Sequence, residues 1–303
     1  MNEIVRRCME NRRCNVESGI GSERNELMIR KFTGAVLAIL TMSAAPASAQ
    51  EEGGDLRSAV QNPIGSLISV PFKFSFDNGA PNGKANSLTV QPVFPVALGS
   101  DWTLINRFII PIWDAPGGVG GLANMPGGGV PSPSGRQTGL GDINYSGFIS
   151  PAQPKGAIWG LGASVSAPTA SKDSLGSGKW SAGPTGVVLF QPEWGTIGGL
   201  VRHLWSFAGS DTRQDVNQTL FEPFINYNLD DGWYLISDMV ITQNWEAESG
   251  QKLTVPIGGG VGKLLKVGEQ AMNIRAEAYY NVERPDSAPE WTVGFTVQLL
   301  FPK

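Results

Sequence analysis

Hydrophobic and polar residues alternate with the two-residue period of a β-strand along most of the chain after residue 61. The segment 271–283, AMNIRAEAYYNVE, shows this most clearly: its even positions are apolar or amphipathic, and its odd positions include Arg275, Glu277 and Glu283. A soluble sheet with water on one face has this pattern. A membrane barrel with lipid outside and a polar lumen inside has it too. The loops and the tryptophans distinguish these two folds.

The alternation predicts twelve strands and no sustained helical period. The predicted strands cover residues 67–76, 87–98, 102–113, 139–150, 156–168, 180–192, 195–207, 218–229, 233–245, 252–265, 271–283 and 290–301. Most of them reach the ~9–11 residues that a tilted membrane strand needs. Only residues 54–62 suit a short helix, which Pro63 would end.

The predicted connections alternate in length along the chain. Short turns cover 99–101, 151–156, 193–195, 230–232 and 267–270, and longer ones cover 77–86, 114–138, 170–179, 208–217, 246–251 and 284–289. An up-and-down barrel with both termini in the periplasm produces this alternation, whereas a Greek-key sandwich gives no reason for it. We therefore predict an all-β fold, an up-and-down transmembrane β-barrel of about twelve antiparallel strands over residues 64–303.

All nine tryptophans lie near the ends of predicted strands. Indole prefers the membrane–water interface, so outer-membrane barrels carry two aromatic girdles, while a soluble sandwich places tryptophan in its core. The residues expected in the girdles are Trp102, Trp113, Trp180, Trp233, Trp245 and Trp291.

Six prolines fall inside predicted strands, namely Pro71, Pro92, Pro95, Pro111, Pro223 and Pro256. Proline removes a ladder hydrogen bond, and a closed barrel has no edge on which to place it. We expect bulges or local breaks at these positions.

The N-terminal region has the features of an export signal. Arg30 and Lys31 precede an apolar run at 32–45 and the sequence ASAQ at 47–50, which predicts a signal peptide at 28–49. Residues 1–27 are then an upstream extension from a misplaced start codon, or alternatively a cytoplasmic tail. Residues 50–63 form a periplasmic N-terminal segment. Both cysteines precede the cleavage site, so we expect no disulfide bond.

No catalytic or cofactor motif withstands inspection. GGGVGKLL at 258–265 resembles a phosphate loop, but Ile257 and Leu264 replace the Gly and Ser/Thr that such a loop requires, so a glycine-rich barrel wall is the preferred interpretation. The single histidine, His203, and the nearby Ser206 match no hydrolase spacing. The net charge of −4 without a basic cluster argues against nucleic-acid binding. We expect no enzyme, cofactor or metal site.

The polar parity of the strands defines a candidate lumen. Its charged members are Lys73, Arg107, Asp142, Glu222, Asp238, Arg275, Glu277 and Glu283. Buried charges must be paired or hydrated, so a ladder of ion pairs is expected. Such pairs either only stiffen the tube or line a solute path. The strand number does not decide between these two roles, because a barrel of eight strands is filled by side chains and a barrel of sixteen encloses a water channel.

The loop 114–138 contains eight glycines, four prolines and two charges. Loops of this length are often functional or disordered. Folded inward it would constrict the pore, which is the hypothesis we prefer; folded outward it would be a flexible cap.

Three segments resemble the bacterial outer-membrane components of the MetA pathway of phenol degradation: QNPIGSLISVPFKFSFDNG (61–79), LTVQPVFPVALGSDWTLINRFIIPIW (88–113) and GLGDI (139–143). The resemblance implies an outer-membrane β-barrel and uptake of small, including aromatic, solutes, with no catalytic motif to transfer. The chain departs from the usual barrel ending because Pro302 and Lys303 follow Phe301.

We thus expect a channel that admits small solutes by passive diffusion. Its expected partners are outer-membrane lipid, a small-molecule solute and the barrel-assembly machinery. The alternatives are a plugged structural or adhesive barrel and a soluble periplasmic β protein that binds a ligand.

Overall fold

The computed structural model describes residues 50–65, 67–125 and 135–301. The expected upstream extension at 1–27 and signal peptide at 28–49 lie outside the described residues. Residues Gln50–Lys303 form one compact unit. Among the described residues, no helix is long and apolar enough to cross a membrane.

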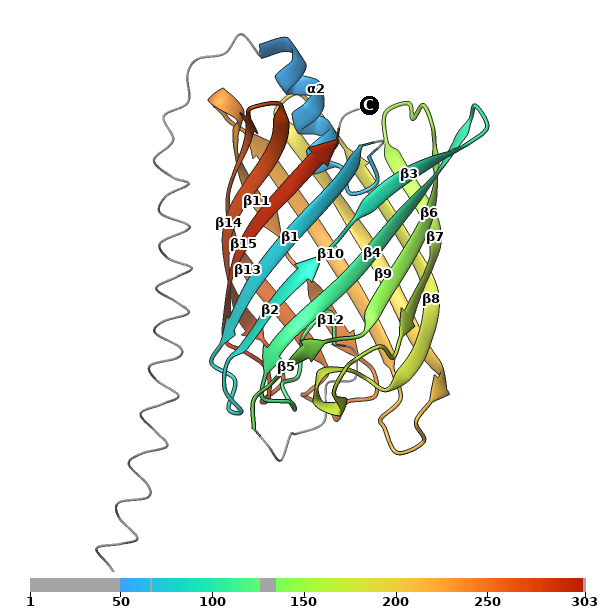
Figure 1. Cartoon of the computed structure of the whole chain (residues 1–303), viewed down its shortest axis with the longest axis vertical. Helices are drawn as coiled ribbons and strands as arrows, with labels where there is room; N and C mark the ends of the chain where they lie inside the picture. The colour runs from blue at the N-terminus through green and yellow to red at the C-terminus, as the bar shows by residue number, and fades with distance from the viewer. Residues whose placement is uncertain (1–49, 66, 126–134, 302–303) are drawn as a thin grey trace, which may run out of the picture. The chain divides into compact units, whose positions relative to one another are not determined.

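In the described part of the chain, a helix precedes a closed antiparallel β-barrel (Figure 1). The elements are α2 (Gln50–Gln61), β1 (Ile68–Asn78), β2 (Ala85–Val90), β3 (Val93–Leu98), β4 (Trp102–Ala115), β5 (Gln137–Leu140), β6 (Ile143–Pro151), β7 (Ile158–Ala167), the 3-10 helix η1 (Asp173–Leu175), β8 (Lys179–Phe190), β9 (Gly195–Gly209), β10 (Asn217–Asn228), the 3-10 helix η2 (Asp230–Gly232), β11 (Trp233–Asp238), β12 (Ile241–Asn244), β13 (Leu253–Val267), β14 (Gln270–Glu283) and β15 (Trp291–Phe301).

Closure comes from the pairing of the first strand with the last, which runs from Ile68 opposite Phe301 to Asn78 opposite Trp291. The pairs β2/β3, β5/β6 and β11/β12 are each two halves of one strand, because both halves pair with the same neighbour. The barrel therefore has twelve strands, and the predicted fold class is confirmed.

The strand breaks lie opposite prolines, as expected from the ladder bond that proline removes. At the three breaks the backbone N–H groups of Gln91, Gly141 and Met239 donate to the carbonyl oxygens of Pro71, Pro111 and Pro223, at 2.9, 2.8 and 3.2 Å. A fourth irregularity is the register shift between Val255 and Pro256 in β13.

The two faces of the wall have opposite character. In β9 the outward side chains of Ile197, Val201 and Trp205 are exposed, while those of Thr196 and Leu200 are buried inside. Large exposed apolar residues of this kind occur on nearly every strand. A continuous apolar exterior around a closed barrel fits a lipid environment. The protein is a membrane-spanning β-barrel.

Eight of the nine tryptophans lie on the outside, with 36% to 50% of each residue exposed: Trp102, Trp159, Trp180, Trp194, Trp205, Trp233, Trp245 and Trp291. The expectation for Trp113 is wrong, since this residue is 3% exposed and lies inside the barrel. Trp102 and Trp113 share β4 and are an odd number of residues apart, so they face opposite sides of the wall.

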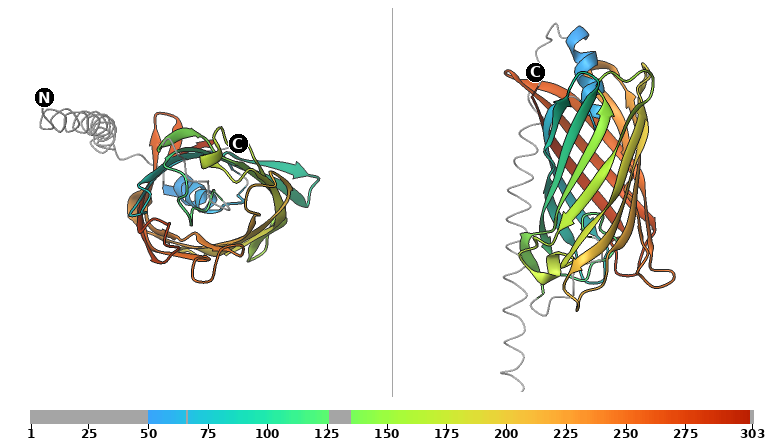
Figure 2. Two further views of the ribbon diagram at one scale, coloured as in Figure 1. Left: turned by 90° about the horizontal axis from the view of Figure 1, so that it is seen from below. Right: turned by 90° about the vertical axis from the view of Figure 1, so that its right-hand side faces the viewer.

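Helix α2 lies at the short-turn end of the barrel, within the barrel outline when the molecule is viewed along its axis (Figures 1 and 2). Gln61 donates from Nε2 to Asn228 Oδ1 at 3.0 Å and accepts from Thr196 Oγ1 at 2.8 Å. Arg57 Nη1 donates to the carbonyl of Leu229 at 2.8 Å. Three residues after the helix ends, Ile64 is buried among side chains of the barrel interior. The N-terminal segment thus fills this end of the lumen.

The glycines of β13 leave the middle of that strand's inner surface without side chains. Inward-facing Gly258, Gly260 and Gly262 carry no side chain, so residues of the neighbouring strands meet across them. Tyr234 pairs with Gly262, lies over it and donates from its hydroxyl to Asn273 Oδ1 of β14 at 2.7 Å. The GGGVG sequence is therefore a barrel-wall motif, as predicted.

We expect Gly262→Ala to destabilise the folded barrel by about 1–3 kcal/mol, because the added Cβ would overlap the ring of Tyr234, which is 1% exposed. Urea titration of the refolded protein in detergent, read by electrophoretic mobility, measures this. Gly294→Ala is the matched control, since its Cβ would meet nothing closer than 3.9 Å. Equal stability of the two variants would contradict the prediction.

Candidate functional site: a divided lumen

The lumen contains two cavities that share part of their lining. The outer cavity, about 230 Å³, lies toward the long loops and is bounded by Gly121–Asn124. The inner cavity, about 100 Å³, is bounded by Val60–Pro63 of the N-terminal segment. Seven residues line both cavities, and we call this group the waist: Lys73, Gln91, Arg107, Glu222, Asp238, Arg275 and Thr296.

One side of the waist is an ion-pair network. Arg275 Nη1 lies 3.6 Å from Asp238 Oδ2, and Arg275 Nε lies 3.3 Å from Glu277 Oε2. Tyr279 donates from its hydroxyl to Glu277 Oε1 at 2.9 Å and accepts from the backbone N–H of Asp238 at 2.9 Å. Asp238 is on β11 and the other residues are on β14, so the network spans the bare glycines of β13.

The described part of the lumen also holds three cations outside this network: Lys73 and Arg107 of the waist, and Arg202 of the outer cavity. Among the described residues, no carboxylate forms an ion pair with Lys73, Arg107 or Arg202. Arg202 is 5% exposed and donates to Asn144 Oδ1 at 3.2 Å and to the carbonyl of Ala123 at 3.4 Å. Asp238 and Glu222 both interact electrostatically with Lys73 and Arg107, and Glu222 also interacts with Arg202.

An apolar cluster fills the lumen beside the waist. Its members come from strands β4, β6, β8, β9 and β10 and from the N-terminal segment: Ile64, Ile105, Phe148, Val187, Leu189, Leu200, Leu220 and Phe224. The sequence analysis assigned polar positions to the lumen and apolar positions to the outside. It therefore did not predict this cluster, whose apolar residues occupy inward positions. The lumen is therefore amphipathic, with an apolar arc facing an arc of paired charges.

The described part of the loop after β4 folds into the barrel. Val119, Leu122 and Met125 are buried in a cluster with Trp113, and Ala123 packs against the apolar cluster of the lumen. Residues 116–125 therefore take the inward, constricting arrangement that we preferred. Residues 126–134 of the predicted loop lie outside the described residues.

The structure places six of the eight predicted lumenal charges on the outer cavity: Lys73, Arg107, Glu222, Asp238, Arg275 and Glu277. The prediction that Asp142 lines the lumen is wrong. Its carboxylate accepts hydrogen bonds from the backbone N–H and the hydroxyl of Ser177, at 2.6 and 2.7 Å, and so anchors the loop between β7 and β8. The prediction that Glu283 lines the lumen is also wrong, since this residue is exposed at the long-loop end of β14.

Two charged lining residues were missed. Arg202 and Asp77 both line the outer cavity. Arg202 precedes His203, and adjacent residues face opposite sides of a strand. The alternation in β9 gives no signal for this pair, because both parities are apolar: Leu200 and Leu204 are buried inside, and Ile197 and Val201 are exposed outside.

His203 faces outward and does not pair with Ser206. Its Nδ1 lies 2.8 Å from Thr219 Oγ1, and its Nε2 lies 3.0 Å from Asn217 Oδ1. The Ser206 hydroxyl instead donates to Asp215 Oδ1 at 3.1 Å. The expectation that the chain has no catalytic site stays a prediction.

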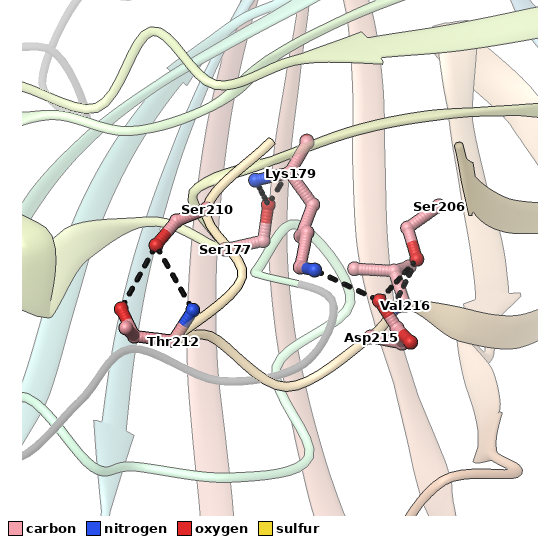
Figure 3. Close-up of polar contacts among 7 residues, drawn as sticks. All are labelled: Ser177, Lys179, Ser206, Ser210, Thr212, Asp215 and Val216. Carbon is pink, nitrogen blue, oxygen red and sulfur yellow. Dashed lines mark hydrogen bonds and ion pairs between the residues drawn. The ribbon is translucent and has the colours of Figure 1, made fainter. Parts of the chain in front are cut away.

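Polar contacts join two long loops at the ends of β8 and β9 (Figure 3). Lys179 Nζ lies 2.9 Å from Asp215 Oδ1, and Ser206 Oγ accepts from the backbone N–H of Val216 at 3.0 Å. Ser177 Oγ accepts from the backbone N–H of Lys179 at 3.2 Å. The loop that Asp142 anchors is thereby tied to the loop between β9 and β10.

The sequence matches the family described as "Putative MetA-pathway of phenol degradation" over residues 58–301. The chain belongs to this family. No curated protein matches the sequence. Among solved structures, this family member is similar to an outer membrane channel from Pseudomonas putida F1, with a TM-score of 0.57 and 15% identity over 86% of this chain and 100% of that one.

Other similar structures are more distant. Outer membrane phospholipase A from Escherichia coli has a TM-score of 0.42 and 12% identity over 82% of this chain and 97% of that one. The CymD monoaromatic hydrocarbon channel has a TM-score of 0.36 and 7% identity over 83% of this chain and 92% of that one. At these identities the likeness concerns the barrel fold alone.

The loop contact should depend on pH. The hydrogen bond from Lys179, followed by that from Ser206, holds the pKa of the Asp215 carboxyl below its usual range. A carboxyl with a lowered folded-state pKa stabilises above its unfolded pKa, and this stabilisation is lost as the pH falls through the folded pKa. We expect Asp215→Asn to speed hydrogen exchange in residues 210–216 at neutral pH, and to match the wild type in strong acid. A difference that persists in strong acid would contradict this origin.

Proposed function

We propose that the protein is an outer-membrane channel that admits small solutes by passive diffusion. The observation that carries this proposal is the pair of cavities along the barrel interior, which meet at the waist. A barrel whose charges served only to stiffen it would have no need of two cavities meeting at charged side chains. Family membership and the fold shared with a channel from Pseudomonas putida F1 support the proposal.

The size of the cavities limits the solute. An engineered protein cavity of about 150 Å³ accommodates benzene. The outer cavity, about 230 Å³, therefore suits a molecule with one aromatic ring. The apolar residues of its wall, including Phe148, Leu200 and Leu220, offer a surface for such a ring. Solutes of this size also agree with the family description.

One observation favours a second candidate, a plugged barrel. The N-terminal segment bounds the inner cavity and is held by Gln61, Arg57 and buried Ile64. The proposed channel thus requires this segment to move aside or to leave a narrow path beside it. Lipid contact through the exposed apolar exterior is part of the same proposal, and recognition by the barrel-assembly machinery stays a prediction.

Deletion of residues 50–65 should raise single-channel conductance severalfold, because the segment lies in the path at the short-turn end. Planar-bilayer recording in KCl measures this. Heat-modifiable mobility in electrophoresis shows whether the variant is folded, and Gln61→Ala with Arg57→Ala provides a milder variant that loosens the same segment. Folded variants that stay electrically silent would favour the plugged barrel.

Arg275→Ala should shift ion selectivity toward cations, because it leaves Asp238 and Glu277 without their common counter-ion at the waist. The reversal potential across a KCl gradient reports the shift. Lys155→Ala, in an exposed short turn, is the control that removes one positive charge away from the lumen. Unchanged selectivity in Arg275→Ala would remove this residue from the conduction path.

A further inference from the structure

The tip of the loop after β4, Gly121–Asn124, bounds the outer cavity and is held by the barrel at its start and near its end. At its start, the backbone N–H of Gly120 donates to the carbonyl of Ser287 at 3.3 Å. Gly121 then lies so close to its neighbours that an added Cβ would come within 2.9 Å of the Ala288 Cβ. The tip therefore begins in contact with the loop between β14 and β15.

Near its end the tip is held by a single side chain of the barrel wall. Arg202 of β9 donates from Nη2 to the carbonyl of Ala123 at 3.4 Å. The same guanidinium donates from Nη1 to Asn144 Oδ1 of β6 at 3.2 Å. Arg202 is only 5% exposed. One buried arginine thus joins two strands of the wall to the tip.

Short inward side chains leave room for this arginine to lie along the wall. Strands β7 and β8 separate β9 from β6 in the barrel. On β8, Thr185 lies opposite Arg202 in the ladder. On β7, the inward residues are all glycine or serine: Gly160, Gly162, Ser164 and Ser166. A longer residue at these positions would separate the guanidinium from Asn144.

Asn144 is itself held in one orientation. Its Nδ2 donates to Ser164 Oγ at 2.9 Å and to the carbonyl of Val165 at 3.1 Å, so its Oδ1 is the atom that accepts from Arg202. A guanidinium is a rigid, planar fork. Fixing one of its nitrogens against Asn144 therefore fixes the direction of the other, which points to the tip.

We propose that Arg202 is the positioning residue that holds the tip inside the barrel, and that it thereby sets the size of the solute that can pass the tip. The inference rests on the proposed function, because it concerns the width of the same path. A buried guanidinium needs acceptors for its N–H groups, and the Ala123 carbonyl is one of them. An outward movement of the tip would break this bond, so the bond favours the narrow form.

Hydrogen exchange of the folded protein in detergent, followed by mass spectrometry, tests the position of the tip. Arg202→Gln should speed exchange in residues 119–125 by about tenfold, as expected when one hydrogen bond to a charged group is lost. Arg202→Lys should have a similar effect although it keeps the charge, because an ammonium lacks the planar fork. Asn144→Ala should also speed exchange, but it should add nothing in a chain that already carries Arg202→Gln.

Lys73→Gln is the matched control for charge. Lys73 lines the same cavity, but its electrostatic partners are charges on β4, β10, β11 and β14. The control removes one positive charge and should leave exchange at the tip unchanged. Heat-modifiable mobility shows that each variant is folded, and exchange in β14 shows whether the effect is confined to the tip.

A cysteine in the outer cavity measures the width of the path past the tip. Both cysteines of the chain precede residue 50, so Ser75→Cys combined with Cys8→Ser and Cys14→Ser leaves one thiol, on the cavity wall. The probes are two neutral methanethiosulfonates, one with a benzyl group and one with a larger naphthylmethyl group. Arg202→Gln should raise the ratio of the naphthylmethyl rate to the benzyl rate by about tenfold, because the larger probe must wait for the tip to move.

Each result supports or overturns a stated part of the proposal. Unchanged exchange at the tip in Arg202→Gln would overturn the positioning role. So would wild-type exchange in Arg202→Lys, since the charge alone would then be sufficient. An unchanged ratio of the two thiol rates would overturn the claim that the tip sets the size limit.

Neither measurement depends on ion flow, so the proposal and the channel function can fail separately. The expected changes in a barrel that stays silent in planar bilayers would support the role of Arg202 and refute the channel. A conducting barrel in which Arg202→Gln changes nothing at the tip would refute the role of Arg202 and leave the channel.

Discussion

The structure depends on the pairing of β1 with β15. In a bilayer there is no water to satisfy backbone N–H and C=O groups, so a sheet can cross only if it has no free edge. Eleven residue pairs, from Ile68 and Phe301 to Asn78 and Trp291, join the two ends of the chain and close the barrel. Closure also divides each strand into an outer and an inner set of side chains, and every later feature follows from that division.

The outer set is simple because lipid makes the same demand along every strand. Apolar side chains form the exposed band, and indoles lie near both ends of the strands. Exceptions are accommodated locally. Trp113 points inward and packs beneath the loop that follows its strand. His203 faces outward, where Thr219 and Asn217 satisfy both ring nitrogens.

The inner set is more varied, because lumenal side chains must satisfy one another. Glycines in β13 remove one row of side chains, which lets Asp238 and Tyr234 reach residues of β14. On the opposite arc, buried apolar residues from five strands, β4, β6, β8, β9 and β10, form a cluster with Ile64 of the N-terminal segment. The barrel thus divides its interior into paired charges, unpaired cations and apolar surface. That combination distinguishes the lumen from a uniformly polar water channel.

The sequence by itself determined the number of strands, their order and the face to which most side chains point. These features follow from a two-residue period and from turn lengths, which are local properties of the chain. Most of the strand prolines likewise marked breaks or register shifts, because a missing N–H is a property of the residue itself, whereas Pro95 lies in a regular ladder opposite Ile105. Only the tertiary structure decided which inward residues meet. Gln61 bonds Asn228 and Arg202 reaches Ala123, although 167 and 79 positions separate them in the chain. Contacts across a barrel depend on closure and on the volumes of intervening side chains, and neither leaves a periodic trace in the sequence.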